Sequence, residues 1–292
     1  MRVTTISPFG FCMGVTKAIE VAKKAKKEHP NEDVFVIGNL VHNERIIEEI
    51  RTLGLIVLDE REKSLRDWLI SLPEQSVIVF TAHGHAPELD EIASRKKMLV
   101  YDSTCVFVEE NEEMIKEEIR SGGEIIYIGQ RNHAEANGAI GIDESKIHLL
   151  VPGESLTLKC LHTSEPLVIS QTTMAPNEIQ ESIQEILKIF PKAKIAAKRC
   201  TATEIRQRNI LKAPENTDLF LVLGSKTSNN TMKLYEIAKA FYRKADVFRV
   251  LGLSELKTLN LSGYQNAVIA SGASTSIADV HEIESYLKSI NY

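Results

Sequence analysis

Long apolar segments are missing from this sequence of 292 residues. No run approaches the roughly 18 apolar residues that a transmembrane helix needs, and the first residues, MRVTTISPFG, contain no apolar stretch typical of a signal peptide. An excess of positive charge is missing as well, because the formal net charge is -5. A duplex-binding protein usually carries a basic face. We therefore expect a cytoplasmic protein with no nucleic-acid partner and no membrane partner.

Cysteine is scarce, with only 4 residues in the chain, and none of them forms a close C-x-x-C pair with another. In the cytoplasm such cysteines are reduced thiols, metal ligands or catalytic groups rather than disulfides. Three of them, Cys12, Cys105 and Cys200, divide the chain into nearly equal thirds, whereas Cys160 falls outside this spacing. A small buried side chain is the simpler interpretation of any single cysteine, and we apply it to Cys160.

The three thirds share one sequence pattern. In each, a short apolar stretch precedes the cysteine, a helical pattern follows it, and a buried-strand pattern then ends in glycine, as in DVFVIG, EIIYIG and DLFLVLG. Strands that alternate with helices predict parallel sheets joined by crossover helices. We therefore expect an α/β fold of three similar small domains, at 1–104, 105–197 and 198–292, arranged with pseudo-threefold symmetry around a central cavity.

Polar side chains recur at the carboxyl ends of the predicted strands, where parallel sheets bind ligands. The equivalent positions, in the loops after the first and the later strands, are held by His42, His83, His133, Thr172, Ser228 and Ser274. The loop GSKTSNNTMKL adds Asn229 and Asn230 but lacks the Gly-Lys-Ser/Thr ending of a nucleotide P-loop. Neutral donors near helix N-termini suit a phosphate group. Taken alone, the loop is somewhat more typical of a helix N-cap. Because polar residues recur at the matching positions, we expect a phosphate-binding ring.

Glu135, in RNHAEANG, is the one carboxylate that we expect inside this ring, two residues after His133. Burial beside a bound anion would raise its pKa, which suits a proton donor. Glu44 holds the matching place in the first third, but NERIIEEI is typical of the start of a helix. We interpret Glu44 as an acid of the first helical turn.

Three thiols at the same point of a repeat can hold zinc or an iron–sulfur cluster. Structural zinc normally takes its ligands from close cysteine pairs, which makes it the weaker interpretation here. Cubane clusters usually take four cysteines. With three, one iron is left without a protein thiolate and can bind a substrate as a Lewis acid.

The motifs GFCMGV, LVHNERI, TAHGH, DSTC, GQRNHAEANG, SQTT, CTATEIRQ, GSKTSNNTMKL and SGAST occur in an order that resembles the 4-hydroxy-3-methylbut-2-enyl diphosphate reductase family. The resemblance covers nearly the whole chain. It implies three α/β domains around a [4Fe–4S] cluster held by Cys12, Cys105 and Cys200. It also implies that Glu135 donates a proton and that Thr172 helps to relay protons to the substrate.

The substrate implied by the resemblance is an allylic alcohol diphosphate. Its diphosphate would contact His42, His83, His133, Ser228, Asn229, Asn230 and Ser274. Two electrons and two protons would remove the hydroxyl as water and yield isopentenyl and dimethylallyl diphosphate, the last step of the non-mevalonate isoprenoid pathway. Because no G-x-G-x-x-G fingerprint is present, we expect an external electron donor such as ferredoxin or flavodoxin.

The sequence departs from the family pattern at three loops. Val106 replaces a common proline, Asn229 replaces a common serine, and TSIAD lacks the usual proline after Ser274. Two alternatives also remain open. A quinolinate-synthase-like iron–sulfur lyase would act on carboxylates, for which arginine is the better clamp, and no ring position is arginine. A non-catalytic zinc or iron–sulfur protein is the other.

Overall fold

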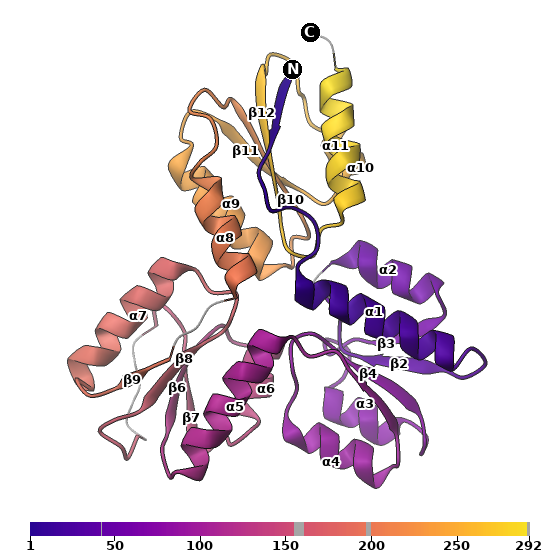
Figure 1. The fold of residues 1–292 in the computed structure, drawn as a ribbon, viewed down its shortest axis with the longest axis vertical. Helices are drawn as coiled ribbons and strands as arrows, with labels where there is room; N and C mark the ends of the chain where they lie inside the picture. The colour runs from indigo at the N-terminus through magenta and orange to yellow at the C-terminus, as the bar shows by residue number, and fades with distance from the viewer. Residues whose placement is uncertain (42, 155–160, 197–199, 291–292) are drawn as a thin grey trace. The chain divides into compact units, whose positions relative to one another are not determined.

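The structure is a computed structural model that describes residues 1–41, 43–154, 161–196 and 200–290. Within these residues it contains three four-stranded sheets, and every strand pair in them is parallel (Figure 1). The chain forms two compact units, one built from residues 1–15, 43–44 and 200–290 and the other from residues 16–41, 45–154 and 161–196. The predicted α/β class with parallel sheets is confirmed.

Helices and strands alternate along the chain as predicted. The chain begins with β1 (Arg2–Thr5) and α1 (Met13–Glu28). One sheet and its helices follow: β2 (Val34–Ile37), α2 (Glu44–Thr52), β3 (Leu55–Leu58), α3 (Leu65–Ser71), β4 (Val77–Phe80), α4 (Pro87–Arg95) and β5 (Leu99–Asp102). The next comprises α5 (Val106–Arg120), β6 (Ile125–Ile128), α6 (Ala134–Ile140), β7 (Ile147–Leu150), β8 (Leu167–Ser170), α7 (Pro176–Ile189) and β9 (Lys194–Ile195). The last comprises α8 (Thr201–Ile210), β10 (Leu219–Leu223), α9 (Asn229–Phe241), β11 (Asp246–Val250), α10 (Leu253–Leu256), β12 (Asn266–Ser271) and α11 (Ile277–Ser289).

The three sheets have one topology, with strand orders β3-β2-β4-β5, β7-β6-β8-β9 and β11-β10-β12-β1. Strand β1 therefore belongs to the sheet of the C-terminal third, where Arg2 lies opposite Asn266 and Thr5 opposite Ile269. This differs from the expectation that residues 1–104 form one domain. The reason lies in the repeat: the edge strands β5 and β9 each precede a cysteine, and β1 is the strand that precedes Cys12. The other boundaries, and the pseudo-threefold arrangement around a central cavity, stay predictions.

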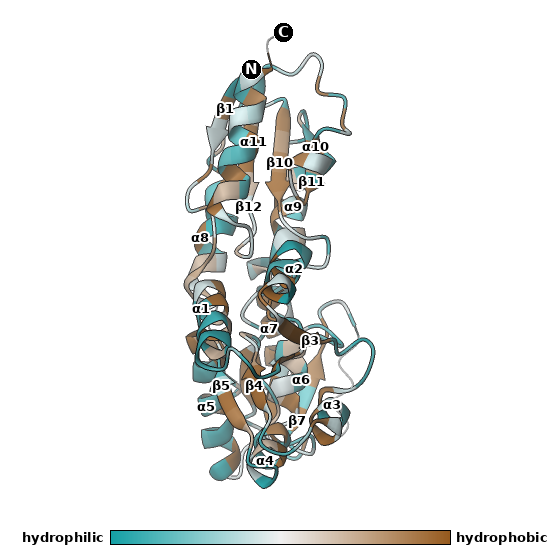
Figure 2. Ribbon diagram, turned by 90° about the vertical axis from the view of Figure 1, so that its right-hand side faces the viewer, coloured by the Kyte–Doolittle hydropathy of each residue, from teal (hydrophilic) through white to brown (hydrophobic). Residues whose placement is uncertain are grey.

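Each sheet is covered by helices on both faces, which explains why its central strands are predominantly apolar. Along β10, Leu221 packs in a cluster with Ile283 of α11, whereas its neighbour Phe220 packs with Leu234 of α9. Figure 2 shows such strands as predominantly apolar and the helices with polar outer faces. Among the described residues, no helix combines the length and the apolar character needed to cross a membrane.

Candidate functional site

The predicted site residues lie in the loops at the carboxyl ends of the strands. His133 and Ser228 are the N-cap residues of α6 and α9, which follow the central strands β6 and β10. His83 and Thr172 follow β4 and β8 within three residues, and Ser274 follows β12. His42 and Cys160 lie outside the described residues. Each of these side chains therefore lies at the carboxyl edge of its own sheet, where parallel sheets bind ligands.

The three cysteines of the repeat are half-buried and lie at the starts of helices. Cys105 and Cys200 are the N-cap residues of α5 and α8, and Cys12 directly precedes α1. The Cys105 amide donates a hydrogen bond to the Ala82 carbonyl (3.1 Å), and the Cys12 amide donates to the Ala273 carbonyl (3.0 Å). Cys105 is thus hydrogen-bonded to the loop that carries His83, and Cys12 to the loop that carries Ser274. The two contacts are equivalent in the repeat.

Cys12 and Cys200 lie in the same unit, and Cys200 is close enough to influence the ionisation of Cys12. Burial raises the pKa of the Cys12 thiol and Cys200 raises it further, whereas Arg206 lowers it. Arg206 is only 4% exposed and donates to the Gly10 carbonyl (2.7 Å). Its Nε has no hydrogen-bond partner among the described residues, and the two thiols are the charges that act on it. A buried cation of this kind needs an anion beside it.

The donor chemistry around these cysteines fits an anionic, sulfur-ligated group. Thiols at helix N-termini form thiolates more readily, and the Arg206 guanidinium favours negative charge beside Cys12 and Cys200. In the part of the chain that the structure describes, no three His, Cys, Asp or Glu side chains lie close enough together to hold a metal ion. Joint ligation by Cys12, Cys105 and Cys200 therefore stays a prediction.

Glu135 is the most deeply buried carboxyl of the predicted set, with 3% of the residue exposed. Thr172 holds both of its oxygens: the backbone amide donates to Oε1 (2.8 Å) and the hydroxyl donates to Oε2 (2.9 Å). The Tyr127 hydroxyl donates to Oε1 at 3.4 Å. Burial raises the pKa of Glu135 to about 7, and the three hydrogen bonds do not offset it. The carboxyl can therefore hold and release a proton near neutral pH.

Two histidines of the predicted ring face each other in the same unit as Glu135. The imidazoles of His83 and His133 meet edge to face, with ring centroids 6.0 Å apart. His133 Nδ1 accepts the Glu135 amide hydrogen (3.2 Å), so a neutral His133 carries its own proton on Nε2. His83 Nδ1 lies 3.4 Å from the Thr81 hydroxyl. His133 and Glu135 thus stand together at the start of α6, and their sharing of one ligand cavity stays a prediction.

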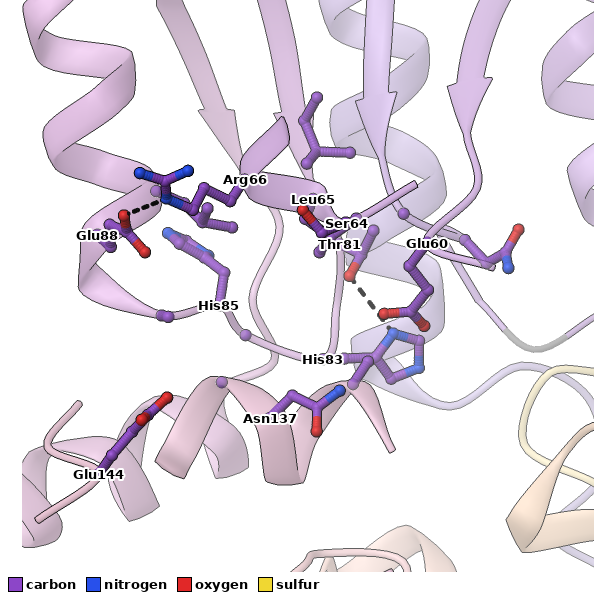
Figure 3. Close-up of a pocket in the computed structure, with 18 residues that line it drawn as sticks. Glu60, Ser64, Leu65, Arg66, Thr81, His83, His85, Glu88, Asn137 and Glu144 are labelled. Carbon is purple, nitrogen blue, oxygen red and sulfur yellow. Dashed lines mark hydrogen bonds and ion pairs between the residues drawn. The ribbon is translucent and has the colours of Figure 1, made fainter. Parts of the chain in front are cut away.

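A cavity of about 440 Å³ adjoins His83 in this unit. Figure 3 shows Glu60, Thr81 and His83 on one side of it, with Asn137 of α6 below them and the Arg66–Glu88 ion pair (2.6 Å) on the other side. Burial raises the pKa of Glu60, and the neighbouring Asp59 adds to this effect. The cavity therefore lies at the carboxyl edge of the sheet and is lined by both polar and apolar side chains.

The loop before α9 has the features of an anion site. The Ser228 hydroxyl accepts the Thr231 amide hydrogen (3.3 Å) and caps the helix. Asn230 is 6% exposed, yet neither atom of its side-chain amide has a hydrogen-bond partner among the described residues. Because buried amides are almost always hydrogen-bonded, these orphaned atoms support a ligand at this loop. The N-cap interpretation of the loop is correct, and phosphate binding at this loop stays a prediction.

Glu44 and Asn43 shape the surroundings of this loop. Glu44 is an acid of the first turn of α2, as expected, and its Oε1 also accepts hydrogen bonds from the hydroxyls of Ser225 (2.9 Å) and Thr227 (3.1 Å). Asn43 Nδ2 donates to the Ser274 carbonyl at 2.6 Å. These contacts hold two predicted ring loops in place.

Sequence reasoning missed three polar residues of these sites, Glu60, Tyr127 and Arg206. It also missed that Glu44 binds the loop before α9. Glu60 had a detectable signal, because it follows the short apolar run LIVL, which is typical of a buried strand. Tyr127 is a polar group within an otherwise apolar buried strand. Arg206 had no local signal, since its neighbours come from the other end of the chain.

Comparison with known proteins agrees with this geometry. The sequence model of the LytB protein family matches residues 3–288. The 4-hydroxy-3-methylbut-2-enyl diphosphate reductase of Bacillus thuringiensis (strain Al Hakam) is 32% identical over 289 residues, which cover 99% of this chain and 90% of the relative. That of Bacillus cereus (strain B4264) is 31% identical over 293 residues, covering 100% and 91%.

Two solved structures share the fold. The E-1-hydroxy-2-methyl-but-2-enyl-4-diphosphate reductase from Plasmodium falciparum superposes with a TM-score of 0.85 at 24% identity, over 98% of this chain and 88% of that one. A second reductase, described as the terminal enzyme of the non-mevalonate pathway, gives a TM-score of 0.70 at 24% identity, over 99% and 100%. On the family match and the full-length relatives, this chain belongs to the LytB protein family.

Proposed function

We propose that this chain is an iron–sulfur oxidoreductase that reduces 4-hydroxy-3-methylbut-2-enyl diphosphate to isopentenyl and dimethylallyl diphosphate, in the non-mevalonate pathway. The LytB family membership and the names of the full-length relatives support the reaction. The observation that carries the proposal in the structure is the buried Glu135 carboxyl, held by Thr172, with a pKa of about 7. A reaction that removes a hydroxyl as water needs a proton donor of this kind.

Cys12, Cys105 and Cys200 would hold a [4Fe–4S] cluster in this proposal. When bound, such a cluster supplies electrons one at a time and offers an iron without a protein thiolate as a Lewis acid. The buried Arg206 supports an anionic group beside Cys12 and Cys200. The electrons would come from an external donor such as ferredoxin or flavodoxin, and the cytoplasmic location likewise stays a prediction from the sequence.

Glu135 and Thr172 would manage the proton. The Thr172 hydroxyl donates to Glu135 Oε2 when the carboxyl is ionised, and a hydroxyl can turn to accept when the carboxyl is protonated. A proton on Oε2 can therefore pass to the Thr172 oxygen while the hydroxyl gives its own proton to the substrate. The backbone amide of Thr172 keeps Oε1 in place throughout.

The diphosphate would be bound by neutral donors rather than by lysine or arginine. They are His42, His83, His133, Ser228, Asn229, Asn230 and Ser274. The orphaned side-chain amide of Asn230 and the Nε2 proton of a neutral His133 support this assignment. Neutral donors would bind the diphosphate without neutralising its negative charge. That charge would add to the effect of burial and keep the pKa of Glu135 raised.

The test uses anaerobically purified protein. Iron and acid-labile sulfide are assayed together with the visible absorption spectrum, and turnover of the allylic diphosphate is followed with a chemically reduced one-electron donor. We expect stoichiometric iron and sulfide and formation of both five-carbon diphosphates. Zinc in place of iron would contradict the proposal. A cluster without turnover of the allylic diphosphate would also contradict it and would favour a non-catalytic binding protein.

A further inference from the structure

Gln171 is a fully buried glutamine that directly follows β8. It belongs to the motif SQTT, in which Thr172 is the predicted relay residue and the glutamine has no role in the site described above. A buried side-chain amide needs hydrogen-bond partners for both its carbonyl and its amino group. The partners of Gln171 therefore indicate why an amide is placed here.

The side chain of Gln171 joins the loops that follow the neighbouring strands β6 and β8. Its Oε1 accepts the backbone amide hydrogen of Gln130 (3.1 Å), in the loop between β6 and α6. Its Nε2 donates to the Thr173 hydroxyl (2.9 Å), in the loop after β8. Because a backbone amide can only donate, Oε1 must face Gln130 and the amino group must face Thr173. We call these two hydrogen bonds the Gln171 bridge.

Close packing keeps the Gln171 bridge in place. A Cβ atom at position 129, a glycine, would lie 2.9 Å from Tyr127 Cε1 and 3.3 Å from Gln171 Oε1, so a larger residue there would displace these side chains. One residue before Gln171, the Ser170 carbonyl accepts a hydrogen bond from Asn111 Nδ2 of α5 (3.1 Å), and this asparagine is 3% exposed. Buried amides therefore hold the loop after β8 on both sides of position 172.

Thr172 lies between the two residues that the bridge connects, and it is the residue that holds Glu135. Its backbone amide donates to Glu135 Oε1 (2.8 Å) and its hydroxyl donates to Oε2 (2.9 Å). Both bonds run from the loop after β8 to the first turn of α6, which directly follows the loop of Gln130. The Gln171 bridge therefore joins the same two segments that must keep their spacing for Thr172 to reach Glu135.

We propose that Gln171 is a positioning residue for proton delivery, which holds Thr172 within hydrogen-bonding distance of both carboxyl oxygens of Glu135. The proposal rests on the proposed function of Glu135 and Thr172. A side-chain amide does not ionise, so Gln171 acts through Thr172 and not as an acid or a base. A misplacement of about 1 Å can slow a reaction by about a hundredfold, so a small shift of the loop is enough.

The experiment compares Gln171→Met with Gln180→Met, a matched change at an exposed glutamine of α7 in the same unit. Methionine has nearly the same length as glutamine and removes both hydrogen bonds of the bridge. Turnover of the allylic diphosphate by the anaerobic holoenzyme is followed with a chemically reduced one-electron donor. In Gln171→Met we expect kcat to fall by about tenfold to a hundredfold and KM to change by less than about threefold. Gln180→Met should behave as the parent.

A double-mutant cycle with Thr172→Val distinguishes positioning from a general structural defect. Once the Thr172 hydroxyl is absent, its position no longer matters for proton delivery. Adding Gln171→Met to Thr172→Val should therefore lower kcat by less than about threefold further. A defect unrelated to Thr172 would lower kcat by the same factor in both backgrounds, and that result would overturn the proposal.

A second measurement does not depend on turnover. The hydrogen bonds from Thr172 lower the pKa of Glu135, so loosening them in Gln171→Met should raise this pKa by about half a unit or more in carboxyl-selective ¹³C NMR. Thr173→Val, which removes the acceptor of the Nε2 bond, should raise it as well and provides the test if Gln171→Met does not fold. An unchanged Glu135 titration in the variant that folds would overturn the proposal. If the parent enzyme does not turn over the allylic diphosphate, the proposed function fails instead, and the titration still tests the bridge.

Discussion

Replacing Glu135 with glutamine tests whether this carboxyl holds a proton near neutral pH. Burial raises its folded-state pKa from the ordinary 4.5 to about 7. Since one pKa unit corresponds to about 1.4 kcal/mol, ionising Glu135 in the fold costs about 3 kcal/mol more than in the unfolded chain. Glutamine keeps the shape of the side chain but neither ionises nor donates a proton as an acid. We expect the variant to bind substrate and to lose about 10²- to 10⁴-fold in turnover.

The direction of the stability change follows from the raised pKa. Between about pH 4.5 and pH 7 the folded state binds more protons at Glu135 than the unfolded state does, so stability falls as pH rises. The contribution of the protonated carboxyl is fully present below the unfolded pKa and is lost as pH rises through about 7. Glu135→Gln does not show this loss. Its free energy of unfolding should therefore gain about 3 kcal/mol relative to the parent across this range, most of it between about pH 5 and pH 8.

Anaerobic urea unfolding of the parent and Glu135→Gln, measured at several pH values across this range, gives the difference directly. The matched control is Glu154→Gln in the same unit, because Arg131 lowers the pKa of that exposed carboxyl. The control should not gain stability relative to the parent as pH rises. A difference between parent and Glu135→Gln that does not change with pH would show that Glu135 is already ionised at neutral pH, and it could not then be the proton source.

Three further substitutions test the other parts of the site. Asn230→Ala should weaken binding of the diphosphate product by about tenfold in calorimetry, because a hydrogen bond to a charged group is lost; an unchanged affinity would remove this loop from the phosphate site. Arg206→Met should lower the iron and sulfide retained per chain, whereas Arg208→Met, on the exposed face of the same helix, should not; equal retention in the two would mean that the buried cation does not stabilise the thiolates. Cys200→Ser should abolish the visible absorption and the activity, while Cys160→Ser should keep both, and equal losses would contradict the assignment.

The class of fold could be predicted because its signal is local. A run such as VIVF (Val77–Phe80) is apolar at every position, and the structure buries every one of these residues between two layers of helices. The partner of β1 could not be predicted in this way. Its residues are as compatible with one parallel sheet edge as with another, and its pairing with β12 joins residues from opposite ends of the sequence. Once the sheets are known, each cysteine is seen to follow an edge strand. This rule identifies β1 as the edge strand of the C-terminal sheet.

The site was predictable to the extent that it repeats. Spacing from strand ends placed Glu135 beside His133, and the repeat correctly indicated that the cysteines stand at helix starts. Arg206 carries no such signal, because its burial and neighbours distant in sequence determine what it does. From the sequence alone, an arginine on a helix is expected to face solvent, because arginine is seldom fully buried.

One backbone position shows how the repeat yields different chemistry in each third. Glu44, Glu135 and Asn230 all stand in the first turn of the helix that follows a central strand. The hydroxyl groups of Ser225 and Thr227, in the loop before α9, donate hydrogen bonds to Glu44. Glu44 therefore helps to position this loop. Asn230 presents an amide that cannot ionise. Glu135 is buried between Thr172 and Tyr127, and burial raises its pKa to about 7. Under the proposed function, Glu135→Asn should therefore retain affinity for the diphosphate and lose turnover.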